Sequence, residues 1–378
     1  MKNPQLNCVF LGLSITSTWG NGHATTYRGL LKELSARGHR LTFLERDVPW
    51  YAANREFETV PYCDIHLYGS VGELKDRWWE LIRGADVVVI GSYVPDGISV
   101  ARWLSSVARN LLSFYDIDTP VTLANLHAGT CDYLARDLVG KFHLYLSFTG
   151  GPTLEYIEAE LGSPSARPLY CSVDPTLYYP EERPSKWDIG YLGTYAADRQ
   201  PALDSLLLSV ARAERGKQFA VAGPQYPETV IWPANVERIY HLPASEHREF
   251  YNSQRFTLNL TRRDMVRAGY SPSVRLFEAA ACGVPIISDE WPGLETIFRP
   301  GLEIFLARKS GDVTSYLCNS DDERIEVGHR ARVQTLRFHT AAVRAEQFEK
   351  YVTASLERLF CSNNRSRSSR TSPAAALI

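Results

Sequence analysis

Short apolar runs alternate with helix-length amphipathic segments along most of this chain. In the first half the runs are NCVFLGL, RLTFLER, DIHLYG, DVVVIGS, LLSFYD and FHLYLSF. A strand with one solvated face alternates apolar and polar residues, whereas a parallel strand is covered on both faces and is apolar almost throughout. The repeated order of buried strand and helix therefore predicts an α/β fold with a parallel, doubly wound sheet.

The alternation is interrupted at residues 172–187, SVDPTLYYPEERPSKW, where three prolines and a cluster of charges are typical of a linker. After it the pattern resumes with WDIGYLGT, QFAVAGP, VERIYHLP, RFTLNLT and VPIISDEW. A chain of 378 residues, 44% of them hydrophobic, is long enough for two cores. We therefore expect one α/β domain at residues 1–171 and a second at residues 188–338.

The C-terminal part predicts helices followed by a polar tail. Residues 321–360 show helical apolar spacing, with two helices meeting near His339, so we expect residues 339–360 to form a final helix. Residues 361–378, CSNNRSRSSRTSPAAALI, are polar and are expected to be disordered.

Composition excludes several classes of function. A formal net charge of −2 supplies no basic field for nucleic acid or an anionic membrane. The seven cysteines are scattered without a Cys-x-x-Cys pair, which argues against a zinc site or a disulfide framework and for a reducing compartment. No basic leader is present and no apolar run approaches the roughly 18 residues of a membrane span. We expect a cytoplasmic protein without a transmembrane segment.

Two open α/β sheets in tandem bind ligands in the cleft at the carboxyl ends of their strands. The loop TSTWGNGHATTYRG follows the first strand, and Gly20 and Gly22 allow close approach of a ligand to the backbone. His23 stands at the start of the next helix, where an imidazole can act as a general base or cap the helix. Thr25 replaces the third glycine of a dinucleotide fingerprint, so the pattern does not favour NAD.

Two further loops of the first half carry candidate residues. In FYDIDTP, Asp116 and Asp118 form an Asp-x-Asp, but nothing nearby completes a metal shell. We expect one of them to face the cleft as a base or hydroxyl binder while the other caps a turn. In LANLHAGT, interpreted as another strand-end loop, His127 is a candidate ligand contact or a structural histidine.

The second half contains loops suited to a phosphorylated nucleoside. In GYLGTYAADRQP, a small residue, a hydroxyl and a guanidinium, at Gly193, Thr194 and Arg199, can meet a phosphate. The loops AVAGPQYP and IYHLP end the following strands and can form the walls around a nucleobase. Their candidate residues are Gly223, Pro224, His241 and Leu242.

The segment SPSVRLFEAAACGVPIISDEW predicts a loop, a helix and a buried strand. Ser273 and Arg275 stand at the helix start, where the backbone N–H groups and the guanidinium can hold a diphosphate. Glu278 follows one turn later and can accept hydrogen bonds from vicinal hydroxyls such as those of a ribose. A buried glutamate needs such a partner or an ion pair, so an internal Arg275–Glu278 pair is the alternative.

Much of the chain resembles bacterial GT-B glycosyltransferases of the spore-maturation-protein (CgeB)-like kind. The resemblance rests on WGNGHATTYR, FYDIDTPVTLANL, SFTGGPTL, PLYCSVDP, GYLGTYAADRQP, VAGPQYP and SPSVRLFEAAACGVPIISDEWPGLE. It implies two Rossmann-like domains facing a cleft, with an acceptor bound by the first and a nucleotide sugar by the second. It also implies that the C-terminal helix returns to cover the first domain.

The same resemblance implies roles for individual residues. Glu278 would hold the ribose, Arg199 and Arg275 the diphosphate, and Gly223 with residues 241–243 would lie near the base. Residues 20–23 would face the reaction centre. Many retaining members carry a second glutamate eight residues before the first, and here Tyr270 stands at that position, so retention is not indicated.

These observations predict a hexosyltransferase-type GT-B enzyme that moves a sugar from a nucleotide-diphosphate sugar to an acceptor hydroxyl without metal or cofactor. The expected acceptor is a saccharide, a lipid-linked glycan or a protein. His23 is the first candidate for the base, with Asp116 and Asp118 behind it. The alternatives are a nucleotide-sugar 2-epimerase of the same architecture and a non-catalytic nucleotide-sugar-binding protein.

Overall fold

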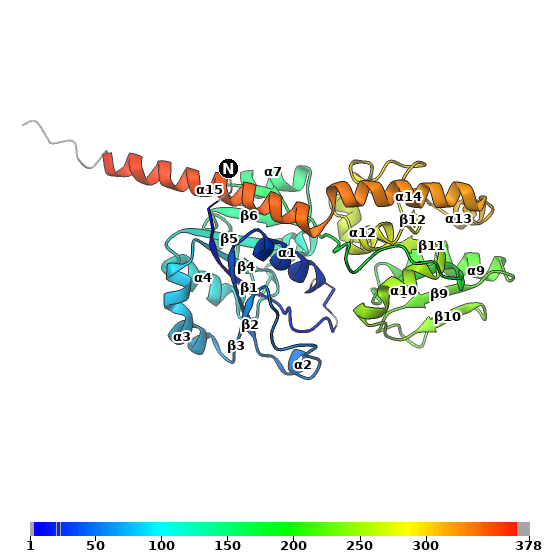
Figure 1. Cartoon of the computed structure of the whole chain (residues 1–378), viewed down its shortest axis with the longest axis horizontal. Helices are drawn as coiled ribbons and strands as arrows, with labels where there is room; N and C mark the ends of the chain where they lie inside the picture. The colour runs from blue at the N-terminus through cyan, green and yellow to red at the C-terminus, as the bar shows by residue number, and fades with distance from the viewer. Residues whose placement is uncertain (1–3, 20, 23, 369–378) are drawn as a thin grey trace, which may run out of the picture.

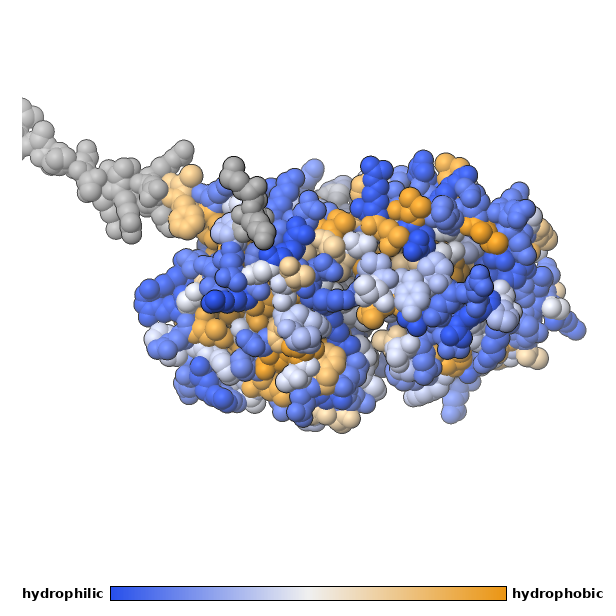
Figure 2. Space-filling view, in the orientation of Figure 1, coloured by the Kyte–Doolittle hydropathy of each residue, from blue (hydrophilic) through white to orange (hydrophobic). Residues whose placement is uncertain are grey.

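The computed structural model describes residues 4–19, 21–22 and 24–368, and residues 362–368 by their backbone only. These residues form two domains, each built on one parallel sheet with helices on both faces (Figure 1). The visible surface of both domains is mostly hydrophilic, with an indentation between the two lobes (Figure 2). Among the described residues, no helix combines the length and hydrophobicity that a membrane span needs.

The first sheet has seven strands in the order β3-β2-β1-β4-β5-β6-β7. The order reverses between β1 and β4, and in such sheets ligands bind at this switch point, outside the carboxyl ends of the strands. The strands are β1 (Asn7–Gly12), β2 (Arg40–Arg46), β3 (Asp64–Tyr68), β4 (Val87–Gly91), β5 (Leu111–Asp116), β6 (Leu144–Ser147) and β7 (Ala166–Pro168). The helices are α1 (Ala24–Ala36), α2 (Pro49–Ala52), α3 (Val71–Gly84), α4 (Gly97–Val107), α5 (Thr119–Ala128), α6 (Arg136–Val139) and α7 (Pro152–Ala159).

The second sheet has six strands in the order β10-β9-β8-β11-β12-β13, with its switch point between β8 and β11. The strands are β8 (Trp187–Leu192), β9 (Phe219–Ala222), β10 (Val236–Ile239), β11 (Gln254–Asn259), β12 (Ile286–Ser288) and β13 (Phe305–Leu306). The shorter helices are α8 (Gln200–Leu203), the π-helix η1 (Asp204–Leu208), α9 (Ser209–Ala213), η2 (Ala244–Glu246), α10 (His247–Asn252), α11 (Arg263–Ala268), α12 (Val274–Ala281), η3 (Leu294–Thr296) and α13 (Ser310–Leu317).

Two long helices end the chain, α14 (Asp321–Phe338) on the second domain and α15 (Ala341–Ser368) on the first. α15 packs beside α1 and runs along the first domain (Figure 1). Since α15 is helical to Ser368, residues 361–368 of the predicted disordered tail are a continuation of this helix, and that part of the prediction was wrong. Residues 369–378 lie outside the described residues.

One apolar core joins the two domains. It runs from Phe10 and Leu31 of the first domain, through Phe348 of α15, to Leu276 and Phe277 of α12. All five side chains are at most 1% exposed. Because burial of apolar surface is the main stabilising term in folding, this shared core holds the domains against each other as well as within themselves.

The chain passes between the domains twice, and both passages meet at Arg344. Val173 of the outgoing segment exchanges backbone hydrogen bonds with the returning one, accepting from Ala341 at 2.9 Å and donating to the carbonyl of His339 at 3.1 Å. The Arg344 guanidinium is 2% exposed and donates to the Tyr170 carbonyl at 3.0 Å, to the Phe338 carbonyl and to His339 Nδ1 at 2.9 Å each.

His339 connects this crossing to the second domain. Its ring stacks on Phe277 of α12 with centroids 4.5 Å apart and planes inclined by 15°. Burial, reinforced by the positive charge of Arg344, lowers the pKa of His339 to about 3. The imidazole is therefore neutral and can accept the hydrogen bond from Arg344 at Nδ1.

Acidification should destabilise the fold through His339. Between the native pKa near 3 and the unfolded value of about 6.5, the unfolded chain binds the extra proton. The free energy of unfolding therefore falls as the pH decreases across this range. His339→Gln keeps an acceptor for Arg344 but does not titrate, so its stability should fall less steeply.

Melting temperatures measured from about pH 7 to about pH 4 test this expectation. The variant should be less stable than the native chain near neutrality, and the difference should narrow in acid. If the melting temperatures of the two proteins fell by the same amount over this pH range, the assignment of a neutral imidazole to His339 would be wrong.

Candidate active site

A cavity of about 320 Å³ lies between the two domains. We call it the interdomain pocket. The first domain contributes the loop between β1 and α1, with Thr18, Asn21, Gly22 and Thr25. The second domain contributes the carboxyl ends of its strands and the first turns of α10 and α12. Nine of the ten residues predicted to bind a donor line this pocket: Gly193, Thr194, Arg199, Gly223, Pro224, His241, Leu242, Arg275 and Glu278.

The tenth, Ser273, lies apart from this pocket. Its hydroxyl donates to Asn259 Oδ1 at 2.8 Å, and the residue lines a second, smaller cavity. Ser273 therefore helps to join the start of α12 to the end of β11 rather than lining the interdomain pocket.

Two glycines let the strand ends approach each other. A Cβ added at Gly223, where φ is +136°, would lie 2.2 Å from the carbonyl oxygen of Gly193. A Cβ at Gly193 would lie 2.9 Å from Arg275 Nη2 and 2.6 Å from the Tyr191 hydroxyl. Side chains at these two positions would displace the backbone of the pocket wall or the guanidinium beside it.

Arg275 is held in place by the strand ends. Its Nε donates to the Leu192 carbonyl, and Nη1 donates to Asn259 Oδ1 at 3.0 Å. The guanidinium lies over the ring of Tyr191, 5.0 Å from the centroid. Arg275 therefore binds the ends of β8 and β11 and not Glu278. The internal Arg275–Glu278 ion pair, which the sequence left as the alternative, is not formed in the structure.

Glu278 is a buried carboxylate that faces the interdomain pocket. It is 4% exposed, accepts a hydrogen bond at Oε2 from the Tyr251 hydroxyl at 3.1 Å, and lies 3.9 Å from His247 Nδ1. Burial, and then the charge of Glu278, raise the pKa of Tyr251 well above its usual value, so the phenol is a neutral donor. A carboxylate has acceptor capacity for several hydrogen bonds, which leaves Glu278 able to receive ligand hydroxyls.

His247 and Tyr251 also line the pocket and were missed by the sequence reasoning. They are four residues apart on α10, so they lie on one face of that helix. The segment HREFYN carries that spacing, which could have identified them once α10 was recognised as a helix of the second domain.

Arg199 stands at the entrance to α8. Nη2 donates to the Thr194 carbonyl at 2.7 Å, which ties the guanidinium to the loop after β8. Nε is buried and finds no hydrogen-bond acceptor among the described residues. An unpaired buried N–H is unfavourable unless a ligand or water satisfies it, so Arg199 is poised for an anionic or hydroxyl-bearing ligand.

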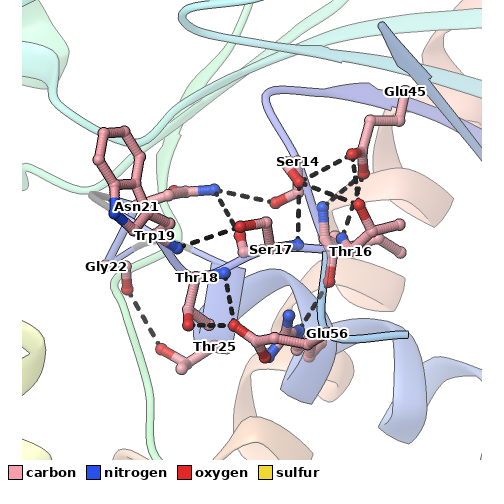
Figure 3. A network of polar contacts seen from close by, with 12 residues as sticks. Ser14, Thr16, Ser17, Thr18, Trp19, Asn21, Gly22, Thr25, Glu45 and Glu56 are labelled. Carbon is pink, nitrogen blue, oxygen red and sulfur yellow. Dashed lines mark hydrogen bonds and ion pairs between the residues drawn. The ribbon is translucent and has the colours of Figure 1, made fainter. Parts of the chain in front are cut away.

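The β1–α1 loop is shaped by two glutamates from outside it (Figure 3). Glu45 of β2 is fully buried and accepts from the Ser14 hydroxyl at 2.8 Å, the Ile15 N–H at 2.8 Å and the Thr16 hydroxyl at 2.6 Å. Glu56 accepts from the Thr18 N–H at 2.8 Å. The loop therefore has a defined shape where it meets the interdomain pocket.

Within this loop, Gly22 lines the pocket as predicted for a cleft residue. Gly20 and His23 lie outside the described residues. The role of His23 as a base therefore stays a prediction from the sequence.

A second cavity of about 140 Å³ adjoins the pocket and shares Gly22, Arg199 and Val274 with it. We call it the apolar cavity. Asp118 lines it and is 6% exposed. Its Oδ2 accepts from the Tyr93 hydroxyl at 2.7 Å and lies 3.6 Å from Arg262 Nη1 of the other domain, while Oδ1 is buried without a hydrogen-bond partner in the described chain.

The prediction for Asp116 as a base needs correction. Asp116 is fully buried, accepts from the Tyr145 hydroxyl at 2.6 Å and the Thr122 hydroxyl at 2.7 Å, and lines neither cavity. Burial raises its pKa to about 6 against the opposing effect of these hydrogen bonds. Its carboxyl joins the ends of β5 and β6 to α5 and has no path to a substrate.

His127 is also placed differently from the prediction. It lies in the last turn of α5 rather than in a loop after a strand, and it is exposed. It lines neither the interdomain pocket nor the apolar cavity. The reason is local: Pro120 occupies the first turn of α5, where proline favours the start of a helix, and Gly129 in the left-handed conformation ends it, so residue 127 falls inside the helix.

The close contact of the two glycines predicts a substitution effect. Gly223→Ala should destabilise the second domain by about 1–3 kcal/mol, because alanine is strained at positive φ and its methyl group would meet Gly193. Gly216→Ala is the matched control, since nothing lies within 4 Å of a Cβ there. Denaturant unfolding of both variants measures the difference, and equal stabilities would refute the steric argument.

Comparison with known proteins agrees with this architecture. Residues 199–350 match the family model described as glycosyl transferase-like. No curated protein sequence matches the chain significantly.

Solved structures match nearly the whole chain. The sucrose-phosphate synthase of Thermosynechococcus elongatus has a TM-score of 0.67 at 13% identity, covering 94% of this chain and 100% of its own. HepE of Anabaena, in complex with UDP-glucose, has a TM-score of 0.67 at 12% identity, covering 93% and 100%. The T4 phage BGT, in complex with its UDP-glucose substrate, has a TM-score of 0.61 at 10% identity, covering 92% and 99%. The chain therefore has the GT-B fold, with two Rossmann-like domains.

Proposed function

We propose that this chain is a glycosyltransferase that transfers a sugar from a nucleotide-diphosphate sugar, bound in the interdomain pocket, to an acceptor hydroxyl. The observation that carries the proposal is the buried carboxylate of Glu278, which faces a pocket bordered by Arg199 and Arg275. The glycosyl transferase-like family match over residues 199–350 supports it. So do GT-B neighbours that were solved with UDP-glucose. The sequence segments alone suggest the spore-maturation-protein-like group within this fold.

The donor would lie along the strand ends of the second domain. Its ribose hydroxyls would donate to Glu278, and its diphosphate would lie beside Gly193, Arg199 and Arg275. The pocket volume of about 320 Å³ falls within the usual range of roughly 300–1,000 Å³ for small-molecule sites. The nucleobase of the donor would contact the loops that carry Gly223 and His241.

Departure of the diphosphate builds negative charge on its oxygens. Two guanidinium groups at the pocket wall would stabilise that charge in a site partly screened from water. The unpaired Nε of Arg199 has an unused hydrogen bond for this purpose. We therefore propose a reaction in which arginines take the part that a divalent metal plays in other transferases.

Among the described residues, Asp118 is the best placed to act as the general base for the acceptor hydroxyl. Its Oδ1 is buried without a hydrogen-bond partner among the described residues, and Asp118 lines the apolar cavity that adjoins the donor pocket. In an inverting displacement this oxygen would take the proton of the acceptor hydroxyl as the hydroxyl attacks the sugar. Tyr270 stands eight residues before Glu278, where many retaining members carry a second glutamate, and its ring occupies the space between Gly151 and Gly293.

Donor binding should depend on Glu278. A nucleotide sugar at about 100 times its dissociation constant should stabilise the native chain by roughly 2.7 kcal/mol, seen as a raised melting temperature. Glu278→Gln should lose most of this shift, whereas Glu326→Gln, an exposed substitution on α14, should keep it. A panel of UDP, GDP and dTDP sugars makes the test independent of which nucleobase the site prefers. If none of them raises the melting temperature, the proposal is refuted.

Turnover should depend on Asp118. Asp118→Asn should lower kcat by about 10²- to 10⁴-fold, as expected for loss of a general base, while nucleotide-induced stabilisation stays unchanged. Asp137→Asn, in an exposed ion pair with Arg102, is the control. The anomeric configuration of the product, measured by NMR, should be inverted, and a retained product would exclude Asp118 as the base.

The thermal-shift and turnover measurements together also distinguish a glycosyltransferase from the two alternative functions. A 2-epimerase would release nucleotide and a sugar of changed C2 configuration without an acceptor. A binding protein would show the thermal shift and no turnover with any acceptor.

A further inference from the structure

The apolar cavity differs in chemistry from the interdomain pocket beside it. Hydrocarbon groups form most of its wall, contributed by both domains. The first domain supplies Ile117 and Phe148, and the second supplies Leu260, Met265 and Val274. A cavity of this composition favours an apolar occupant, since burying polar groups against such walls without partners costs free energy.

Its volume sets the size of that occupant. At about 140 Å³ the cavity is close to the roughly 150 Å³ of an engineered apolar cavity that binds benzene. It would therefore hold one ring-sized hydrocarbon group. A sugar ring of similar size carries hydroxyls around its edge, and each hydroxyl buried without a partner would cost about 1–3 kcal/mol.

The cavity lining includes one carboxylate with an unused acceptor. Asp118 Oδ1 is buried and lacks a hydrogen-bond partner within the described residues. Arg262 lies beside it, with Nη1 3.6 Å from Asp118 Oδ2 and Nε 3.8 Å from Asp198 Oδ2. A single acceptor in a largely apolar cavity suits one hydroxyl group, which can donate its hydrogen bond to Asp118 Oδ1.

We propose that the apolar cavity is the acceptor site and that the acceptor is a compact alcohol or phenol whose hydroxyl is attached to a ring-sized hydrocarbon body. This inference rests on the proposed glycosyl transfer. The hydroxyl proton passes to Asp118, and the acceptor oxygen forms a bond to the anomeric carbon. The bond from that carbon to the diphosphate breaks, and the nucleoside diphosphate leaves with the electron pair.

Benzyl alcohol is a suitable probe, because it combines a hydroxyl with a six-membered hydrocarbon ring. Binding to the full chain is measured by ligand-observed NMR without donor. Met265→Trp should fill the cavity from α11 and weaken benzyl alcohol binding by at least about tenfold, the scale of a misfit in an apolar pocket. Met265→Leu conserves side-chain volume and should retain binding.

Leu302→Trp adds the same bulky ring at an exposed position and should leave binding unchanged. With a donor identified from the nucleotide-sugar panel, mass spectrometry should detect the benzyl glycoside with the native chain and not with Met265→Trp. The thermal shift caused by the nucleotide sugar should be the same for both.

The outcomes separate the two levels of the proposal. If nucleotide sugars bind but benzyl alcohol does not, or if Met265→Trp binds it as well as the native chain does, the acceptor inference is wrong and the donor site stands. Preferred transfer to methyl glucoside over benzyl alcohol would also overturn it. If no nucleotide sugar binds, the proposed function fails, and the acceptor role of the cavity fails with it.

Discussion

The arrangement of the two domains depends on the buried guanidinium of Arg344. A charge in the interior is tolerated only when its hydrogen bonds are satisfied, and here backbone carbonyls and an imidazole accept them. Those acceptors belong to the two segments that pass between the domains. The position of one domain relative to the other is thus tied to the hydrogen-bond requirements of one side chain.

His339 connects Arg344 to the candidate site. Its ring stacks on Phe277, and Phe277 is the neighbour of Glu278 on α12. The carboxylate proposed to hold the donor is therefore one residue from a side chain packed on the interdomain crossing. Further along the same boundary, the Gly150 N–H donates to the Tyr270 carbonyl at 2.9 Å, and the Thr149 hydroxyl donates to Ser271 at 3.0 Å. These contacts bring the end of β6 to the segment before α12, beside the apolar cavity.

The parts of the site that were predictable from the sequence are those governed by local geometry. Gly193 and Gly223 follow apolar strands, and strand ends of a parallel sheet gather at one edge, so their meeting could be inferred without coordinates. Arg275 and Glu278 share one helix, and their spacing fixes their separation. Asp116 and Asp118 show the limit of such reasoning, because β5 ends at Asp116 and the turn after it sends only Asp118 to the domain boundary.

From the sequence alone came the two doubly wound sheets, the order of their strands and helices, and most of the residues along the pocket wall of the second domain. Hydrophobic periodicity and glycine placement act over a few residues, and they are written in the chain itself. The tertiary structure alone decided that His247 and Tyr251 join Glu278, that Asp116 is buried in the core, and that Asp118 pairs with Arg262 of the other domain beside the apolar cavity. Such pairings join residues far apart in the chain, and only the packing of the domains determines which side chains meet.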